Sequence, residues 1–69
     1  MIELSQEQKD LINLLQQLKV NTEDIVITMT CCQEKEQIIQ MINYLLDCYE
    51  NKETITQQTI LNKIVEMNQ

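Results

Sequence analysis

The most reactive side chains in this sequence belong to three cysteines, of which Cys31 and Cys32 are adjacent. Neighbouring residues on a helix point about 100° apart, so this pair cannot grip one zinc ion without unwinding the chain. A zinc site needs at least three well-placed ligands, and no histidine is present to join Cys48 as a further one. We therefore predict no metal site and no cofactor, and interpret Cys32 and Cys48 as small core residues.

A redox role for the cysteine pair is the alternative interpretation. If a helix began at Thr30, with Gln33 completing its capping box, Cys31 and Cys32 would lie in the first turn. The end of the helix dipole found there lowers the pKa of a thiol. Against this, a helix capped by Thr22 needs residues 23–32 to form, and a disulfide between adjacent cysteines would be strained.

Other catalytic groups are scarce. The chain has no histidine, the commonest general acid and base. Its single serine, Ser5, is better explained as a helix cap. Paired acids such as Glu34 and Glu36 are interpreted as solvated surface, because a domain of this size has little volume for a cleft. We predict that the chain is not an enzyme.

Length and composition restrict the fold that must position these residues. The 69 residues form one domain at most, spanning residues 1–69. Glycine and proline are both absent, which removes phosphate-binding loops and most tight hairpins and leaves helix. No apolar run approaches the roughly 18 residues of a membrane helix, and MIELSQEQKD does not resemble a signal peptide. We expect a cytoplasmic protein, and the many Ile, Asn, Lys and Gln residues suggest a bacterial or phage genome rich in AT.

Capping signals and apolar periodicity predict an all-α fold, a small antiparallel bundle of four helices with a short second helix. The expected helices span about residues 5–20, 22–32, 34–50 and 56–68. Ser5 with Gln8 forms a capping box for the first, and Thr22 caps the second. Asparagine is the usual substitute for glycine in a left-handed cap, so Asn21 and Asn51 are the expected ends of the first and third helices.

Two segments leave an alternative open. DIVITM, residues 24–29, is rich enough in β-branched residues to form a strand. The fourth helix is expected to begin at Thr56, with Ile55 and Ile60 as a hydrophobic staple. Thr54 with Gln57 is a competing capping box for the same helix.

The apolar positions predict which faces are buried. The first helix would bury Leu11, Ile12, Leu14, Leu15 and Leu18. The third would bury an arc of about half its circumference, made of Ile38, Ile39, Met41, Ile42, Leu45, Leu46, Cys48 and Tyr49. The fourth would bury Ile60, Leu61, Ile64, Val65 and Met67. The second helix is apolar on two sides, with Ile25, Val26, Met29 and Cys32 on one and Ile27 and Cys31 on the other.

This apolar surplus on the second and third helices predicts a contact with another protein or with a second copy of the chain. The candidate interface residues are Ile27, Cys31, Ile39 and Tyr44. The formal charge of −6 favours solubility and basic partners. We expect a small acidic protein-interaction or structural module that self-associates as a dimer.

A regulator of nucleic-acid machinery is the alternative function. The segment from Leu45 to Val65 superficially suggests a helix-turn-helix reader in which Gln57 and Gln58 contact base edges. Its link is long for that motif and lacks the common glycine. Five lysines and no arginine also leave few cations for phosphates, so direct binding to nucleic acid is disfavoured. A second form of this alternative is that the chain mimics DNA with its acids and occupies a basic protein.

Overall fold

The computed structural model describes residues 4–69, which form four helices and no strand. These helices are α1 (Gln6–Gln17), α2 (Thr22–Cys31), α3 (Lys35–Glu50) and α4 (Gln57–Met67). The predicted all-α fold is confirmed, and DIVITM lies within α2 rather than in a strand. Within the described range, no helix combines the length and apolar character that crossing a bilayer requires.

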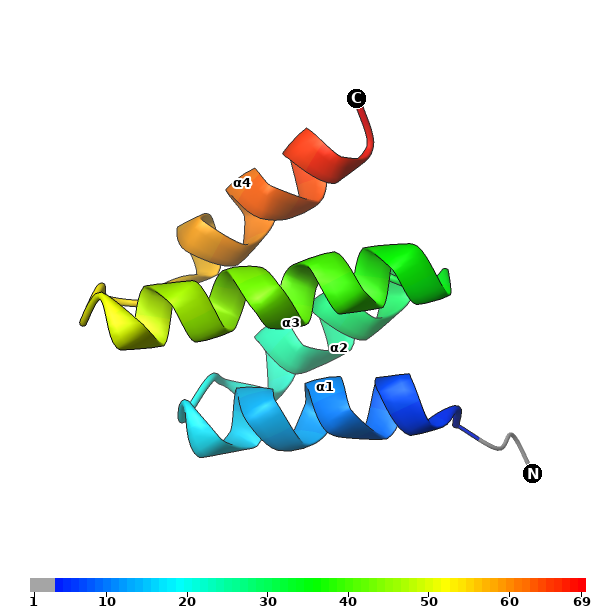
Figure 1. Cartoon of the computed structure of the whole chain (residues 1–69), viewed down its shortest axis with the longest axis horizontal. Helices are drawn as coiled ribbons and strands as arrows, with labels where there is room; N and C mark the ends of the chain where they lie inside the picture. The colour runs from blue at the N-terminus through cyan, green and yellow to red at the C-terminus, as the bar shows by residue number, and fades with distance from the viewer. Residues whose placement is uncertain (1–3) are drawn as a thin grey trace.

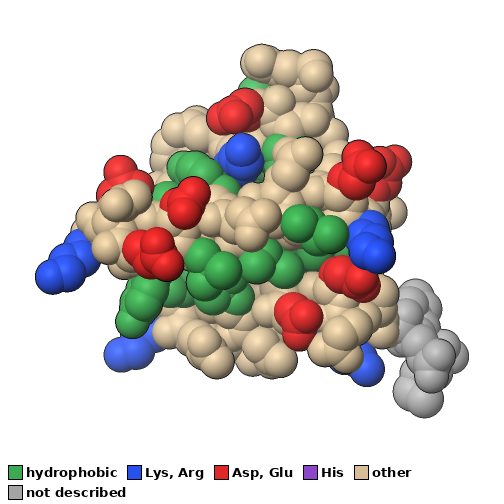
Figure 2. Space-filling model, viewed as in Figure 1, with side chains coloured by type: hydrophobic (Ala, Val, Ile, Leu, Met, Phe, Trp, Pro, Cys, Tyr) green, Lys and Arg blue, Asp and Glu red, His purple; other side chains and the backbone are tan. Residues whose placement is uncertain are grey.

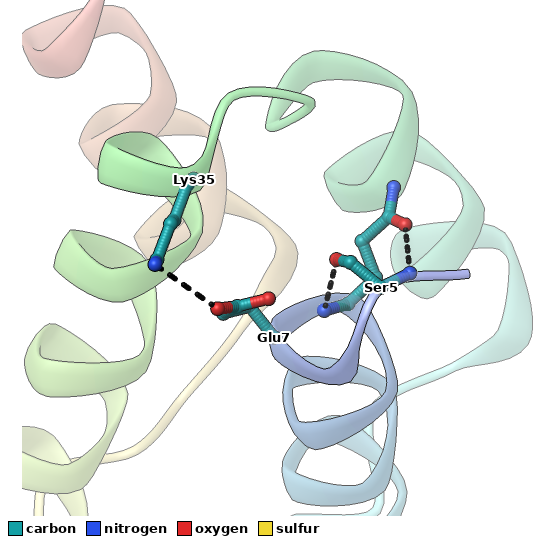
Figure 3. A network of polar contacts seen from close by, with 4 residues as sticks. Ser5, Glu7 and Lys35 are labelled. Carbon is teal, nitrogen blue, oxygen red and sulfur yellow. Dashed lines mark hydrogen bonds and ion pairs between the residues drawn. The ribbon is translucent and has the colours of Figure 1, made fainter.

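Consecutive helices run in opposite directions, so α1 is parallel to α3 and α2 to α4 (Figure 1). The most extensive packing is between α1 and α3 and between α2 and α4. Lys35, in the first turn of α3, lies 3.5 Å from Glu7 in the first turn of α1 (Figure 3). The two parallel helices therefore begin at the same end of the molecule.

The helix starts follow local capping chemistry. At α1 the Gln8 N–H donates to the Ser5 hydroxyl at 3.3 Å, and the Ser5 N–H donates to the Gln8 side chain at 2.8 Å (Figure 3). This confirms the predicted capping box. At α4, Thr56 is the cap, as predicted, and its box partner is Thr59. The competing start at Thr54 is not adopted.

The start of α2 differs from the prediction. Thr22 is the first helical residue rather than the cap. Asn21 takes the cap position with extended backbone angles, and its carbonyl accepts from the Ile25 N–H at 3.0 Å. The Asn21 side chain makes no capping hydrogen bond. Glu23 and Asp24 in the first turn still complement the positive end of the helix dipole.

The C-terminus of α1 is closed by a lysine, not by Asn21 as predicted. Lys19 has a φ of 62°, in the left-handed region that favours glycine. Its N–H donates to the Gln16 carbonyl, and the Val20 N–H donates to the Leu15 carbonyl, both at 3.0 Å. This pair of bonds is a Schellman motif, which satisfies carbonyls that the helix leaves unpaired.

The C-terminus of α3 repeats this arrangement. Asn51 is the C-cap, as predicted, but its φ is −85° and the left-handed residue is Lys52, with φ 58°. The Lys52 N–H donates to the Tyr49 carbonyl at 3.1 Å, and the Glu53 N–H donates to the Cys48 carbonyl at 2.9 Å. In a chain without glycine, lysine thus occupies both left-handed positions in residues 4–69.

One core joins all four helices. Its buried apolar residues are Leu11, Leu15, Cys32, Ile38, Met41, Leu45, Ile60 and Ile64. Ile55 packs against this core next to the start of α4, where the hydrophobic staple was predicted. Five residues assigned to apolar faces are instead solvent-exposed, namely Val26, Ile39, Leu46, Tyr49 and Val65. The helix faces were thus predicted correctly at their centres and too broadly at their edges.

The two apolar sides of α2 prove to flank one buried face whose centre is polar. Asp24 and Thr28, one turn apart, are both buried. The Thr28 hydroxyl donates to the backbone carbonyl of Asp24 at 2.7 Å. This bond within α2 satisfies the buried hydroxyl, so it needs no partner from another helix. Ile25 and Ile27 lie on either side of this centre and pack against the core.

Candidate protein-interaction surface

One side of α3 carries apolar side chains that the core does not enclose. Ile39, Ile42, Leu46 and Tyr49 follow one another at intervals of three and four residues, so they lie along one face of the helix. Ile39 is 41% exposed, Leu46 42% and Tyr49 66%, whereas Ile42 is partly buried. We call these four residues the α3 stripe.

The parallel neighbour α1 forms the other wall of a groove beside this stripe. Leu14, Gln17 and Leu18 of α1 line a hollow of about 190 Å³ together with Leu46 and Tyr49. Gln17, Leu18 and Tyr49 also line a wider, open hollow of about 660 Å³ at the C-terminal ends of the two helices. We call this continuous surface the α1–α3 groove, and Figure 2 shows a band of hydrophobic side chains along the boundary between the two helices.

Acidic side chains border the α1–α3 groove. Glu36 and Glu50 are exposed and lie within about 60° of Ile39 around α3. On α1 the exposed Asp10 lies one turn before Leu14, on the same side of the helix. Figure 2 shows acidic groups on both sides of the hydrophobic band. The groove therefore has an apolar floor and acidic margins.

Lysines lie at the two ends of the groove. Lys35 pairs with Glu7 at 3.5 Å at the N-terminal end. The backbone N–H of Glu7 donates a hydrogen bond to the Glu7 carboxyl, and Lys35 lies nearby. Both hold the pKa of this carboxyl below its ordinary value. At the C-terminal end, Lys19 and Lys52 line the hollow together with Glu50 and Glu53. The ends of the groove are thus of mixed charge.

A second groove lies between α1 and α2, and its lining is uncharged. Ile12 faces Ile25, Val26 and Met29 across a hollow of about 620 Å³, whose remaining lining residues are Gln8, Thr30 and Gln33. Val26 is 59% exposed, although it was predicted to share the buried face of Ile25 and Met29. We call this surface the α1–α2 groove.

The four predicted interface residues do not form a single patch. Ile39 belongs to the α3 stripe. Tyr44, five residues later, lies about 140° from Ile39 around the axis of α3, so its side chain points to a different side of the molecule. The ring of Tyr44 is covered by Lys63 of α4, whose Nζ lies 5.3 Å from the ring centroid. Ile27 packs partly buried against the core, and Cys31 is exposed at the end of α2. Whether any of the four contacts a partner stays a prediction.

Three exposed residues that shape the grooves were missed: Val26, Leu46 and Tyr49. A signal was available for Leu46 and Tyr49 on α3, but not for Val26 on α2. The intervals of three and four from Ile39 to Tyr49 match a heptad pattern, which is typical of a helix that meets a partner helix. The α3 stripe lies at one edge of the apolar arc, whereas the buried residues of α3 lie at the centre of the arc.

Two of the three cysteines are enclosed by the fold. Cys32 and Cys48 are buried, as predicted, and Cys31 is exposed. Burial raises the pKa of the Cys32 thiol to about 11, and burial also raises the pKa of Cys48. The pair lies at the C-terminal end of α2, so the first-turn position that the redox interpretation requires is not formed. Among residues 4–69, no three Cys, Asp or Glu side chains are grouped to hold a metal ion.

The two glutamines considered as base readers lie in the first turn of α4 and are exposed. The Gln58 side chain donates to Asn62 at 2.7 Å. Lys63, further along the same helix, pairs with Glu66 at 3.4 Å. Contact between Gln57 or Gln58 and a nucleic acid stays a prediction.

The chain matches no family model, and no curated protein or solved structure was found to resemble it significantly.

Proposed function

We propose that this chain is a small protein-interaction module that self-associates through the α1–α2 groove. The observation that carries this proposal is an apolar groove without charged lining, in which Val26 is 59% exposed beside Ile25 and Met29. Covering such a surface removes apolar area from water and is favourable. A domain this small has a thin margin of stability, to which association would add.

Electrostatics favours this groove as the contact between copies. Each chain carries a formal charge of −6, so two copies repel one another at a distance. Docking through an uncharged lining avoids bringing like charges into direct contact, which is costly at an interface. A standard interface covers about 800 Å² on each partner. That is roughly one sixth of the 5084 Å² surface of this chain.

Sedimentation velocity over a micromolar to sub-millimolar concentration series tests this proposal. We expect the wild-type chain to dimerise and Val26→Glu to stay monomeric, because the new charge would be buried at the contact. Val65→Glu is the matched control, since Val65 is also a helical valine and is 57% exposed, but it lines neither groove. A wild-type chain that stays monomeric throughout, or equal effects of the two substitutions, would overturn the proposal.

A further inference from the structure

We infer that the α1–α3 groove binds a basic amphipathic helix from another protein. This inference rests on the proposed function as a protein-interaction module, but it concerns a different face from the one proposed for self-association. Its basis is the combination of an apolar floor between two parallel helices and margins that carry acids on both sides.

The dimensions of the groove suit a helix. From Ile39 to Tyr49 the α3 stripe is about 15 Å long, at about 1.5 Å of rise per residue. A partner helix of three to four turns would cover it, with apolar residues at intervals of three and four on one face. The hollow of about 190 Å³ between Leu14, Leu18 and Leu46 offers room for an apolar side chain. Tyr49 is the kind of exposed aromatic residue that commonly dominates binding energy.

Charge selects the partner. Glu36 and Glu50 border opposite ends of the α3 stripe, and Asp10 borders the groove from α1. In an antiparallel pair of copies, Glu36 of one would face Glu50 of the other. In a parallel pair each acid would face its own counterpart. A second copy therefore meets like charges here, whereas lysines or arginines flanking the apolar face of another helix would meet carboxylates.

The lysines near the groove do not cancel this preference. Lys35 is already paired with Glu7 at 3.5 Å. Lys19 and Lys52 lie beyond the apolar floor, at the turns that follow α1 and α3. The margins along the floor thus remain acidic, and a basic helix is the occupant that fits both the shape and the charge.

A pair of synthetic peptides tests the inference. The probe is a labelled helix of about 14 residues, or four turns, with leucines at intervals of three and four and lysines elsewhere. Its counterpart carries glutamates in place of the lysines. Binding is followed by fluorescence anisotropy at low and high salt, for the wild-type chain and for variants whose fold is checked by circular dichroism. We expect the basic peptide to bind and the acidic peptide not to bind.

Matched variants separate the groove from general charge. Tyr49→Ala should weaken binding about tenfold or more, whereas Val65→Ala should leave it unchanged. The double variant Glu36→Gln, Glu50→Gln should weaken binding about fivefold at low salt and less at high salt. Glu23→Gln with Glu66→Gln changes the net charge equally, away from the groove, and should have little effect.

Three results would overturn the inference. They are equal binding of the acidic and basic peptides, no effect of Tyr49→Ala on peptide binding, and loss of self-association in Tyr49→Ala by sedimentation. The last result would assign the groove to a second copy of the chain. Because self-association is tested separately at Val26, failure of the peptide to bind would leave that experiment unaffected, and the two proposals can fail independently.

Discussion

The two left-handed lysines predict that glycine would stabilise this fold. A residue with a Cβ pays about 1–2 kcal/mol in the left-handed region. Glycine avoids that cost but loses about 0.5–1 kcal/mol more conformational entropy on folding. Lys19→Gly and Lys52→Gly should therefore each raise the free energy of unfolding by about 0.5–1 kcal/mol. Because each change acts on the backbone of its own helix end, we expect the gains to add.

Urea and thermal unfolding followed by circular dichroism measure this effect. For a domain of this size, 1 kcal/mol corresponds to about 4–8 °C in Tm, so the double variant, which gains about 1–2 kcal/mol, should melt about 4–16 °C higher. Lys19→Ala and Lys52→Ala remove the charge and keep the Cβ, so they should give no such gain. If the alanine variants matched the glycine variants, or if glycine lowered Tm, the backbone reasoning would be refuted.

Three further predictions concern the core. Leu45→Ala should lower the free energy of unfolding by about 3 kcal/mol, because Leu45 is fully buried, whereas Leu46→Ala at the exposed neighbouring position should cost less than about 1 kcal/mol in the same urea titration. In the native chain a thiol reagent should modify Cys31 quickly and Cys32 and Cys48 slowly, with all three reacting once urea unfolds the chain; rapid native labelling of Cys32 would contradict its burial. Because the pKa of Cys32 is raised from 9.0 to about 11 in the folded chain, stability should be fully present below about pH 9 and should fall as pH rises toward 11. Cys32→Ala should weaken this pH dependence, and an unchanged profile would show that the thiol does not contribute to it.

The helices and the centre of the core were predictable because local and periodic signals agreed. Ser5 and Gln8 satisfy backbone groups within one turn of chain, so their capping box needs no tertiary information. Leu11 and Leu15 are one turn apart, and a helix that buries one of them buries the other. Such signals fix an element before its neighbours are known.

The end of α1 was not predictable in this way. Asparagine is the favoured left-handed residue when glycine is absent, which pointed to Asn21. In the structure Val20 packs against the core, and this contact is typical of the residue that follows the left-handed position in a Schellman motif. Tertiary packing of Val20 thus places the turn at Lys19, two residues before the position that propensity favours.

The candidate surface was predictable only in part. Periodicity shows that the apolar arc of α3 is wide, but not which edge of the arc a neighbouring helix covers. Ile39 was recognised as a candidate interface residue, whereas Leu46 and Tyr49 were assigned to the interior. In α2, the burial of Asp24 and Thr28 depends on where α1 and α4 pack, which no pattern within the helix specifies.

Amide NMR spectra of the isotopically labelled chain, recorded over a concentration series, test self-association through the α1–α2 groove most directly. We predict that resonances of Ile25, Val26 and Met29 shift progressively as the concentration rises, while those of Val65 on α4 do not. Spectra that are independent of concentration, or shifts confined to α4, would contradict the account.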